Sequence, residues 1–254
     1  MQPFRLGVVN FLNAYPLWTA LQNDSRVILV PDIPSRLALE LRAGNLDAAL
    51  ISSVEYLRHP EGFAYHTGLC IAAMAESKSI RLFVQNNDLS FREKIAQTQR
   101  IYTDVASRSS VAQLRVILHE LKHLPDLLVV ANPAERIPVL APGEALLSIG
   151  DTALRYMQYP SYDLQTAYRT IFHRGFVYAL WVGWAAIMPE LKTVLDLAYE
   201  QWLSNQEKLL TEAAQRFGFD RIFTEDYLTR TIVYRLTPER RADLEFFAHR
   251  LEEL

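Results

Sequence analysis

Short runs of β-forming residues alternate with helix-like segments along most of the chain, and this order restricts the folds that the chain can adopt. Helical patterns, such as Pro34 to about Arg42 and Ser109–His123, separate the runs. Alternation of this kind is typical of a parallel or mixed sheet covered by helices, so we expect an α/β protein. The expected strands span 4–9, 27–30, 47–51, 69–75, 79–84, 100–103, 127–130 and 145–149, and an apolar run over 168–184 favours a further buried strand.

From Pro189 onward the pattern is almost wholly helical. An amphipathic helix is expected from Pro189 to Phe217, and it ends near Gly218, a residue type that suits a helix C-terminus. Thr224 and Thr237 are expected to cap two further helices. We assign no residue of this segment to chemistry and expect it to serve as scaffold.

Composition and charge argue against several classes of protein. The chain has 26 Lys and Arg against 29 Asp and Glu without a run of like charges, so neither nucleic acid nor an anionic membrane surface is an expected partner. Cys70 is the single cysteine, which excludes an internal disulfide, and we expect a buried thiol. Residues 1–9 lack a signal-peptide pattern and the apolar runs are too short or too interrupted to span a bilayer, so we expect a cytoplasmic protein.

Sequence motifs bear on two classes of cofactor, nucleotides and zinc. The nine glycines do not cluster, and the chain has neither a phosphate loop nor a dinucleotide fingerprint, so no nucleotide cofactor is expected. Residues 119–123 match the zinc pattern His-Glu-x-x-His. At about 100° per residue, however, His119 and His123 fall opposite the apolar stripe of the expected helix, which includes Leu114 and Ile117. A catalytic zinc needs a third protein ligand and a shaped cavity, so we expect no metal.

The segment from Gly7 to Leu17 carries the first candidate for a ligand contact. A strand over Phe4–Val9 breaks into a loop, and Pro16 can open a helix because proline is tolerated at a first helical position. Asn13 therefore lies at the carboxyl end of a strand and beside a helix start. Open α/β sheets bind small ligands at such places, and helix N-termini favour anions. Asn13 is either a ligand contact or an ordinary helix cap.

Three other segments place polar residues at the end of an expected strand or the start of an expected helix, as the segment of Asn13 does. Ser52 and Ser53 close the strand 47–51, and Gly150 and Asp151 close the strand 145–149. The segment Ser107-Arg108-Ser109-Ser110 precedes the helix 109–123, where hydroxyls and backbone N–H groups together suit a carboxylate. Each of these polar residues is either a cap or a ligand contact. Ser79 follows a polar loop and begins a strand.

Several motifs occur in an order that resembles one known family. The opening Gly-x-Val-x-Phe-Leu-Asn-x-x-Pro-Leu of residues 7–17 is followed by similar stretches at 46–56, 78–83, 107–111, 146–151, 162–164 and 176–181. Residues of about 5–185 thereby resemble the chorismate dehydratases of the futalosine route to menaquinone. The resemblance implies a two-lobed, periplasmic-binding-protein-like fold of type II with mixed sheets and a helical C-terminal segment. One lobe would comprise 1–85 and 176–254, the other 86–175, with the ligand in the cleft between them.

The resemblance also implies an activity. It predicts a hydro-lyase that dehydrates chorismate, a small dicarboxylate, to 3-[(1-carboxyvinyl)oxy]benzoate without a cofactor. Asn13 would hold the departing hydroxyl or a carboxylate, and the proton would go to Asp151, to Asp104 or to the enolpyruvyl carboxylate of the substrate itself. The residues expected to bind substrate are Ser52, Ser53, Ser79, Ser107, Arg108, Ser109, Ser110 and Gly150.

The chain departs from the family pattern at two places. Arg108 stands where the family usually has a small residue, and residues 172–175 replace a common Thr-Gly-x-Pro. His173 and Arg174 therefore either bring charge to the ligand or lie in a surface loop. Two other functions remain open, namely a non-catalytic solute-binding protein of the same fold and the sister enzyme that releases 1,4-dihydroxy-6-naphthoate. That enzyme usually opens with Ser-Pro-Cys-Pro-Asn-Asp, which residues 11–16 do not match.

Overall fold

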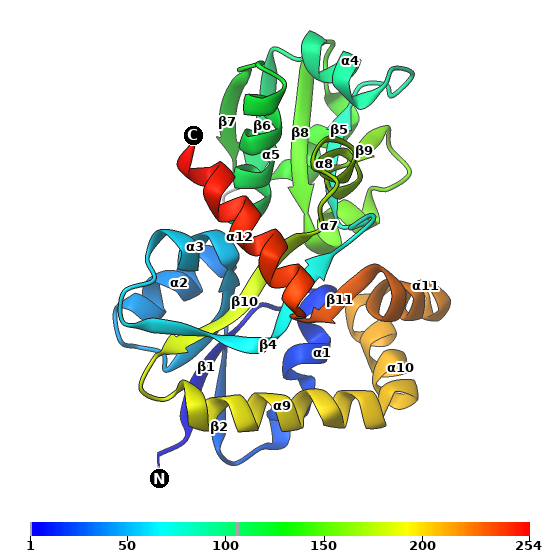
Figure 1. The fold of residues 1–254 in the computed structure, drawn as a ribbon. Coiled ribbons are helices and arrows are strands. Elements are labelled where there is room, and N and C mark those ends of the chain that lie inside the picture. The colour runs from blue at the N-terminus through cyan, green and yellow to red at the C-terminus, as the bar shows by residue number, and fades with distance from the viewer. Residues whose placement is uncertain (1, 105–106) are drawn as a thin grey trace. The chain divides into compact units, whose positions relative to one another are not determined.

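The computed structural model describes residues 2–104 and 107–254, and the chain divides into two compact units (Figure 1). Unit 1 comprises Met1–Ala72 and Val177–Arg241, and unit 2 comprises Ala73–Phe176 and Ala242–Leu254. Each unit contains a mixed β-sheet with helices, as expected of an α/β protein. Among the described residues, no helix combines the length and apolar character needed to cross a lipid bilayer. The cytoplasmic location expected from the sequence stays a prediction.

The sheet of unit 1 has the strand order β11-β4-β10-β3-β1-β2. Strand β1 is parallel to both β2 and β3, whereas β10 runs antiparallel to β3. Every residue of β3 is buried, as expected of a central strand covered on both faces. The bounds of the six strands are Phe4–Val8 (β1), Val27–Pro31 (β2), Ala48–Ser52 (β3), Phe63–Ala73 (β4), Phe176–Trp184 (β10) and Ile232–Arg235 (β11).

The helices of unit 1 connect these strands and form its C-terminal part. They are η1 (Leu12–Ala14), α1 (Tyr15–Trp18), η2 (Thr19–Asn23), α2 (Pro34–Arg42), α3 (Ser53–Arg58), α9 (Met188–Ser204), α10 (Gln206–Phe217), α11 (Arg221–Asp226) and the π-helix η4 (Tyr227–Thr231). Helix α12 (Pro238–Glu252) begins in unit 1 and ends in unit 2. The helix C-terminus expected at Gly218 is present, since this residue follows α10 with a left-handed φ of 68°.

The sheet of unit 2 has the order β7-β6-β8-β5-β9. Strand β6 is parallel to β7 and β8, and β5 runs antiparallel to β8 and β9. The strands are β5 (Ile80–Val84), β6 (Arg100–Asp104), β7 (Asp126–Val130), β8 (Glu144–Ile149) and β9 (Ser161–Asp163). The helices are α4 (Phe91–Gln97), α5 (Arg108–Glu120), α6 (Pro133–Arg136), η3 (Ile137–Val139), α7 (Gly150–Arg155) and α8 (Leu164–Phe172).

Aromatic side chains build much of both cores. In unit 1, the ring of Tyr15 makes edge contacts with Trp18, Trp202 and Phe217, at centroid distances of 5.2 to 6.1 Å. Helix α1 is thereby packed on α9 and α10. In unit 2, Phe176 makes edge contacts with Tyr168 and with Phe247 of α12. Such pairs each add about 0.5–1.5 kcal/mol beyond the burial of their surface.

Several elements differ from the sequence-based expectation. The segment from Pro189 onward, expected to be almost wholly helical, contains strand β11, and β4 begins at Phe63 rather than at residue 69. The strand expected over 168–184 begins only at Phe176, because 164–172 form α8, which is capped by the Asp163 side chain. The single helix expected over 189–217 is interrupted at Asn205 and forms α9 and α10. Asp220, not Thr224, caps α11, since its side chain accepts from the N–H groups of Ile222 and Phe223.

The bounds of the two units also differ from the expected lobes. Residues 73–85 lie with unit 2 because β5 pairs with β8 and β9 in the middle of that sheet. Residues 242–254 lie there too, since Phe247 packs on Phe176 and Arg250 pairs with Glu120 of α5. The placement of a ligand with respect to these units stays a prediction.

Candidate functional site

Asn13 lies in η1, directly after β1, where the chain passes into α1. Its neighbours Leu12 and Ala14 are buried, while Asn13 is only half-buried. The N-cap residue of η1 is Phe11 and that of α1 is Ala14, so Asn13 caps neither helix. The structure therefore removes the capping role that was the alternative to a ligand contact. Asn13 is a partly accessible amide in an otherwise buried segment at the carboxyl end of a parallel strand.

The backbone around Asn13 is tied down from several sides. The N–H of Ala14 donates to the carbonyl of Phe11 at 3.0 Å, and the indole N–H of Trp18 donates to the carbonyl of Val9 at 3.1 Å. The carbonyl of Asn13 itself accepts a hydrogen bond of 3.0 Å from the hydroxyl of Tyr234 in β11. Asn13 thus has a fixed main chain, which is what a side chain that must orient a ligand requires.

Ser52 and Ser53 end the neighbouring strand β3 and begin α3. The Ser53 side chain is fully buried and donates to the carbonyl of Val177 at 2.7 Å, which joins α3 to β10. Ser53 therefore has a structural contact, and Ser52, the N-cap residue of α3, is the better ligand candidate of the two. Because β1 and β3 are parallel neighbours, Asn13 and Ser52 follow strands that end at the same edge of the sheet.

In unit 2 the structure brings Gly150 and Ser79 together. The N–H of Gly150 donates to the carbonyl of Ser79 at 2.8 Å, where β8 and β5 lie side by side. Gly150 has a left-handed φ of 62°, a conformation that costs other residues about 1–2 kcal/mol. The N-cap residue of α7 is Ile149, and Asp151 is a half-buried residue in the first turn of that helix.

Asp163 holds the loop that leads into Ser79. Its carboxylate accepts hydrogen bonds from the N–H groups of Ser77 (3.1 Å) and Lys78 (2.7 Å) and from the hydroxyl of Ser77 (3.0 Å). The same carboxylate accepts from the N–H of Thr166 at 3.0 Å and so caps α8. The half-buried carboxylate of Asp163 therefore fixes both the N-terminus of α8 and the loop that precedes Ser79.

The segment Ser107–Ser110 begins α5, a helix of 13 residues. The side chains of Ser107, Ser109 and Ser110 are 3 to 6% exposed, whereas Arg108 is exposed. The hydroxyl of Ser107, the N-cap residue, has no hydrogen-bond partner within 2–104 and 107–254. Three hydroxyls at the positive end of a helix dipole form an arrangement that suits a carboxylate. Asp104, a candidate base, is half-buried at the end of β6.

The two histidines of the zinc-like motif do not share a helix face. His119 lies in the last turn of α5, which ends at Glu120, and His123 follows Lys122, whose φ is 53°. The Nε2 atom of His123 lies 2.6 Å from the carbonyl of Thr98. Among the described residues, no group of three or more His, Cys, Asp or Glu side chains is placed to bind a metal ion.

His173 and Arg174 have structural contacts within unit 2. His173 ends α8 in a left-handed conformation with a φ of 56°. The guanidinium of Arg174 lies 3.5 Å from the carboxylate of Asp243 and over the ring of Phe246 in α12. These contacts account for the Arg174 side chain without a ligand, and His173 is exposed.

The structure also identifies two contact residues that are not among the candidate site residues, although one of them, Asp163, lies in the stretch 162–164 that resembles the known family. Tyr234 and Asp163 contact the backbone at or beside the candidate positions Asn13 and Ser79. The segment that contains Tyr234 is expected from its pattern to be scaffold. Tyr234 and Asn13 are separated by 221 positions in the sequence, and Asp163 and Lys78 by 85 positions. No local sequence signal could have predicted these contacts.

Comparison with known proteins places the chain among enzymes of one biosynthetic route. The model of a family described as menaquinone biosynthesis matches residues 4–253. A chorismate dehydratase from Thermus thermophilus is 24% identical over 99% of this chain and 96% of its own length.

Solved structures show the same fold at low sequence identity. A protein from Archaeoglobus fulgidus superposes with a TM-score of 0.76 at 13% identity, over 99% of this chain and 97% of its own. The periplasmic aliphatic sulphonate binding protein of Escherichia coli superposes with a TM-score of 0.69 at 12% identity, over 100% of this chain and 87% of its own. These similarities confirm the periplasmic-binding-protein-like fold, and fold alone does not determine function.

Proposed function

The chain belongs to the menaquinone biosynthesis family, and we propose that it is a chorismate dehydratase that forms 3-[(1-carboxyvinyl)oxy]benzoate in the futalosine route. Its similarity to the Thermus thermophilus chorismate dehydratase, which extends over nearly the whole of both chains, supports this proposal. The observation in the structure that carries it is Asn13, a half-buried amide that caps no helix and whose main chain is fixed.

The proposed reaction is an elimination of water. The C3–H bond of chorismate breaks and its electron pair forms a ring double bond, while the C4–O bond breaks and hydroxide leaves. The proton and the hydroxide together make water, and the product ring is aromatic. The protein therefore has to orient a dianion, accept a proton and assist the leaving hydroxide.

Asn13 suits the leaving hydroxyl or a carboxylate, since its amide both donates and accepts hydrogen bonds. Ser52 would add a donor from the same unit, and the buried hydroxyls of Ser107, Ser109 and Ser110 would hold a carboxylate at the start of α5. Three proton acceptors remain open: Asp151, Asp104 and the substrate's own enolpyruvyl carboxylate.

The direct test is incubation of the purified protein with chorismate alone. We expect an aromatic product that is lighter than chorismate by one water, followed by absorbance and mass. Asn13→Ala should abolish its formation while the melting temperature stays near that of the wild type, because Asn13 makes no capping contact. Undiminished turnover in this variant would remove Asn13 from the mechanism.

The similarity to a sulphonate binding protein supports a second candidate, a protein of this fold that binds a small anion without converting it. In that case chorismate would raise the melting temperature and be recovered unchanged. Asp151→Asn separates the proton acceptors under the first proposal. Loss of turnover would favour Asp151, and retained turnover would favour Asp104 or the substrate's carboxylate.

A further inference from the structure

We propose that Tyr234 is a positioning residue for Asn13, and this inference rests on the proposed function. The Tyr234 hydroxyl donates a hydrogen bond of 3.0 Å to the main-chain carbonyl of Asn13. The two residues are 221 positions apart, and both belong to unit 1. Tyr234 thereby connects strand β11 to the short helix η1 that carries the candidate catalytic amide.

The environment of Tyr234 keeps this donor in one place. Its side chain is 4% exposed, and its ring packs against that of Tyr199 at a centroid distance of 5.9 Å. Burial raises the pKa of Tyr234 well above its ordinary value of 10, with a smaller contribution from Tyr227. The hydroxyl therefore remains protonated, and able to donate, throughout the range in which an enzyme works.

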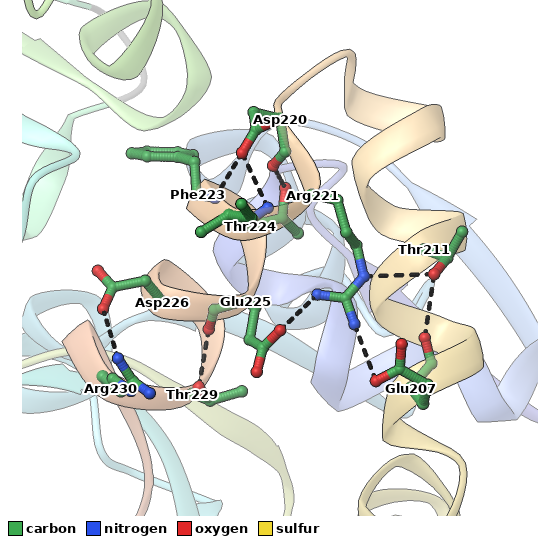
Figure 2. Close-up of polar contacts among 11 residues, drawn as sticks. Glu207, Thr211, Asp220, Arg221, Phe223, Thr224, Glu225, Asp226, Thr229 and Arg230 are labelled. Atoms are coloured by element: carbon green, nitrogen blue, oxygen red, sulfur yellow. Dashed lines mark hydrogen bonds and ion pairs between the residues drawn. The ribbon is translucent and has the colours of Figure 1, made fainter.

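The chain that leads to Tyr234 is itself anchored on α10. Figure 2 shows Arg221 between three partners, with its guanidinium 2.8 Å from Glu225, 3.1 Å from Glu207 and 3.3 Å from the hydroxyl of Thr211. Glu207 and Thr211 lie in α10. Glu225 lies in α11, which leads directly into η4 and then β11.

Helix η4 is a π-helix that packs against η1, and π-helical turns often mark functional sites. In Figure 2 its Thr229 donates to the carbonyl of Glu225, and its Arg230 lies 3.6 Å from Asp226. Phe217 of α10 also contacts the ring of Tyr15, which begins α1. The C-terminal part of unit 1 therefore holds both ends of the segment from Asn13 to Tyr15.

A small displacement of η1 would move the Asn13 amide with respect to the substrate. A misplacement of about 1 Å in a catalytic group can lower turnover by roughly 100-fold. In Tyr234→Phe the ring and its packing remain and only the hydroxyl is lost. We expect kcat to fall about tenfold to 100-fold, with a much smaller change in KM.

The matched control is Tyr199→Phe. Tyr199 is likewise buried, its ring packs on that of Tyr234 and the Arg235 guanidinium lies over it. Among the described residues, its hydroxyl makes no hydrogen bond to η1 that would correspond to that of Tyr234. This variant should keep the wild-type kcat. An equal loss of kcat in both variants would overturn the inference, because it would indicate a general effect of the cluster.

A spectroscopic readout completes the test. In asparagine-labelled protein, the side-chain amide resonance of Asn13, assigned by its absence from Asn13→Ala, should move in Tyr234→Phe and stay in place in Tyr199→Phe. An unmoved resonance refutes the positioning role. If wild-type protein leaves chorismate unchanged while the resonance moves, the proposed function fails and the positioning of Asn13 stands.

Discussion

Removing the carboxylate of Asp163 should be one of the most damaging single changes in unit 2. In Asp163→Ala, α8 loses its N-cap acceptor, which costs about 1 kcal/mol. The N–H groups of Ser77 and Lys78 also lose their acceptor, and each buried donor left unsatisfied costs about 1–3 kcal/mol. The Ser77 side chain is fully buried, so water does not easily replace the carboxylate. Together these losses amount to about 3–7 kcal/mol in the free energy of unfolding.

The assay is urea unfolding of wild type and variant, followed by circular dichroism. The matched control is Asp220→Ala in unit 1. This aspartate likewise caps a short helix, but within the described part of the chain its carboxylate accepts only from the N–H groups of Ile222 and Phe223. That change should cost about 1 kcal/mol. Equal losses in the two variants would refute the reasoning, because they would show that the loop contacts of Asp163 contribute nothing beyond its cap.

Three further changes test other parts of the structure. Gly150→Ala places a side chain at a φ of 62° and should cost about 1–2 kcal/mol in thermal unfolding, and turnover should fall as the approach to α7 shifts. Ser53→Ala leaves the buried carbonyl of Val177 without its donor and should cost about 1–3 kcal/mol, whereas Ser52→Ala should change substrate affinity more than stability, as read from KM and melting temperature. Burial lowers the pKa of His66, and the opposing effect of Asp196 is smaller. The imidazole of His66 therefore binds a proton more readily in the unfolded chain than in the folded one. The stability that His66 contributes is present above about pH 6.5 and is lost as the pH falls below that value. Melting curves of the wild type and His66→Gln at several pH values would show this difference.

The sequence predicts the alternation of strands and helices because each depends on local patterns. Strands β1, β3 and β8 are short apolar runs followed by polar residues, and Pro16 and Pro34 are placed where proline is tolerated at a helix start. Candidate positions at strand ends follow from the same patterns, since an open α/β sheet presents its strand ends to ligands.

Helix α8 was less predictable for a physical reason. Its residues are aromatic and β-branched enough to suit a strand, yet Tyr168 and Phe172 are four positions apart and also suit one face of a helix. Asp163 decides between the two by capping the helix, and its second set of contacts reaches across to Ser77 and Lys78. The cap itself is local, whereas the contacts that hold Asp163 in place come from residues 85 and 86 positions away, which a local window does not include.

The residues of the candidate site also fall into a group that local sequence predicts and a group that it does not. Residues that would touch a ligand follow their own strands, so Asn13, Ser52 and Gly150 are recognisable from their neighbours in the sequence. The groups that hold the backbone at these positions come from remote segments, because a turn at a strand end has no regular hydrogen-bond ladder of its own and must take its partners from elsewhere. Tyr234 in strand β11 is such a partner for Asn13. Substitutions in residues that touch no ligand should therefore alter turnover wherever they supply such a backbone contact, and the Tyr234→Phe and Tyr199→Phe pair separates that effect from simple loss of packing.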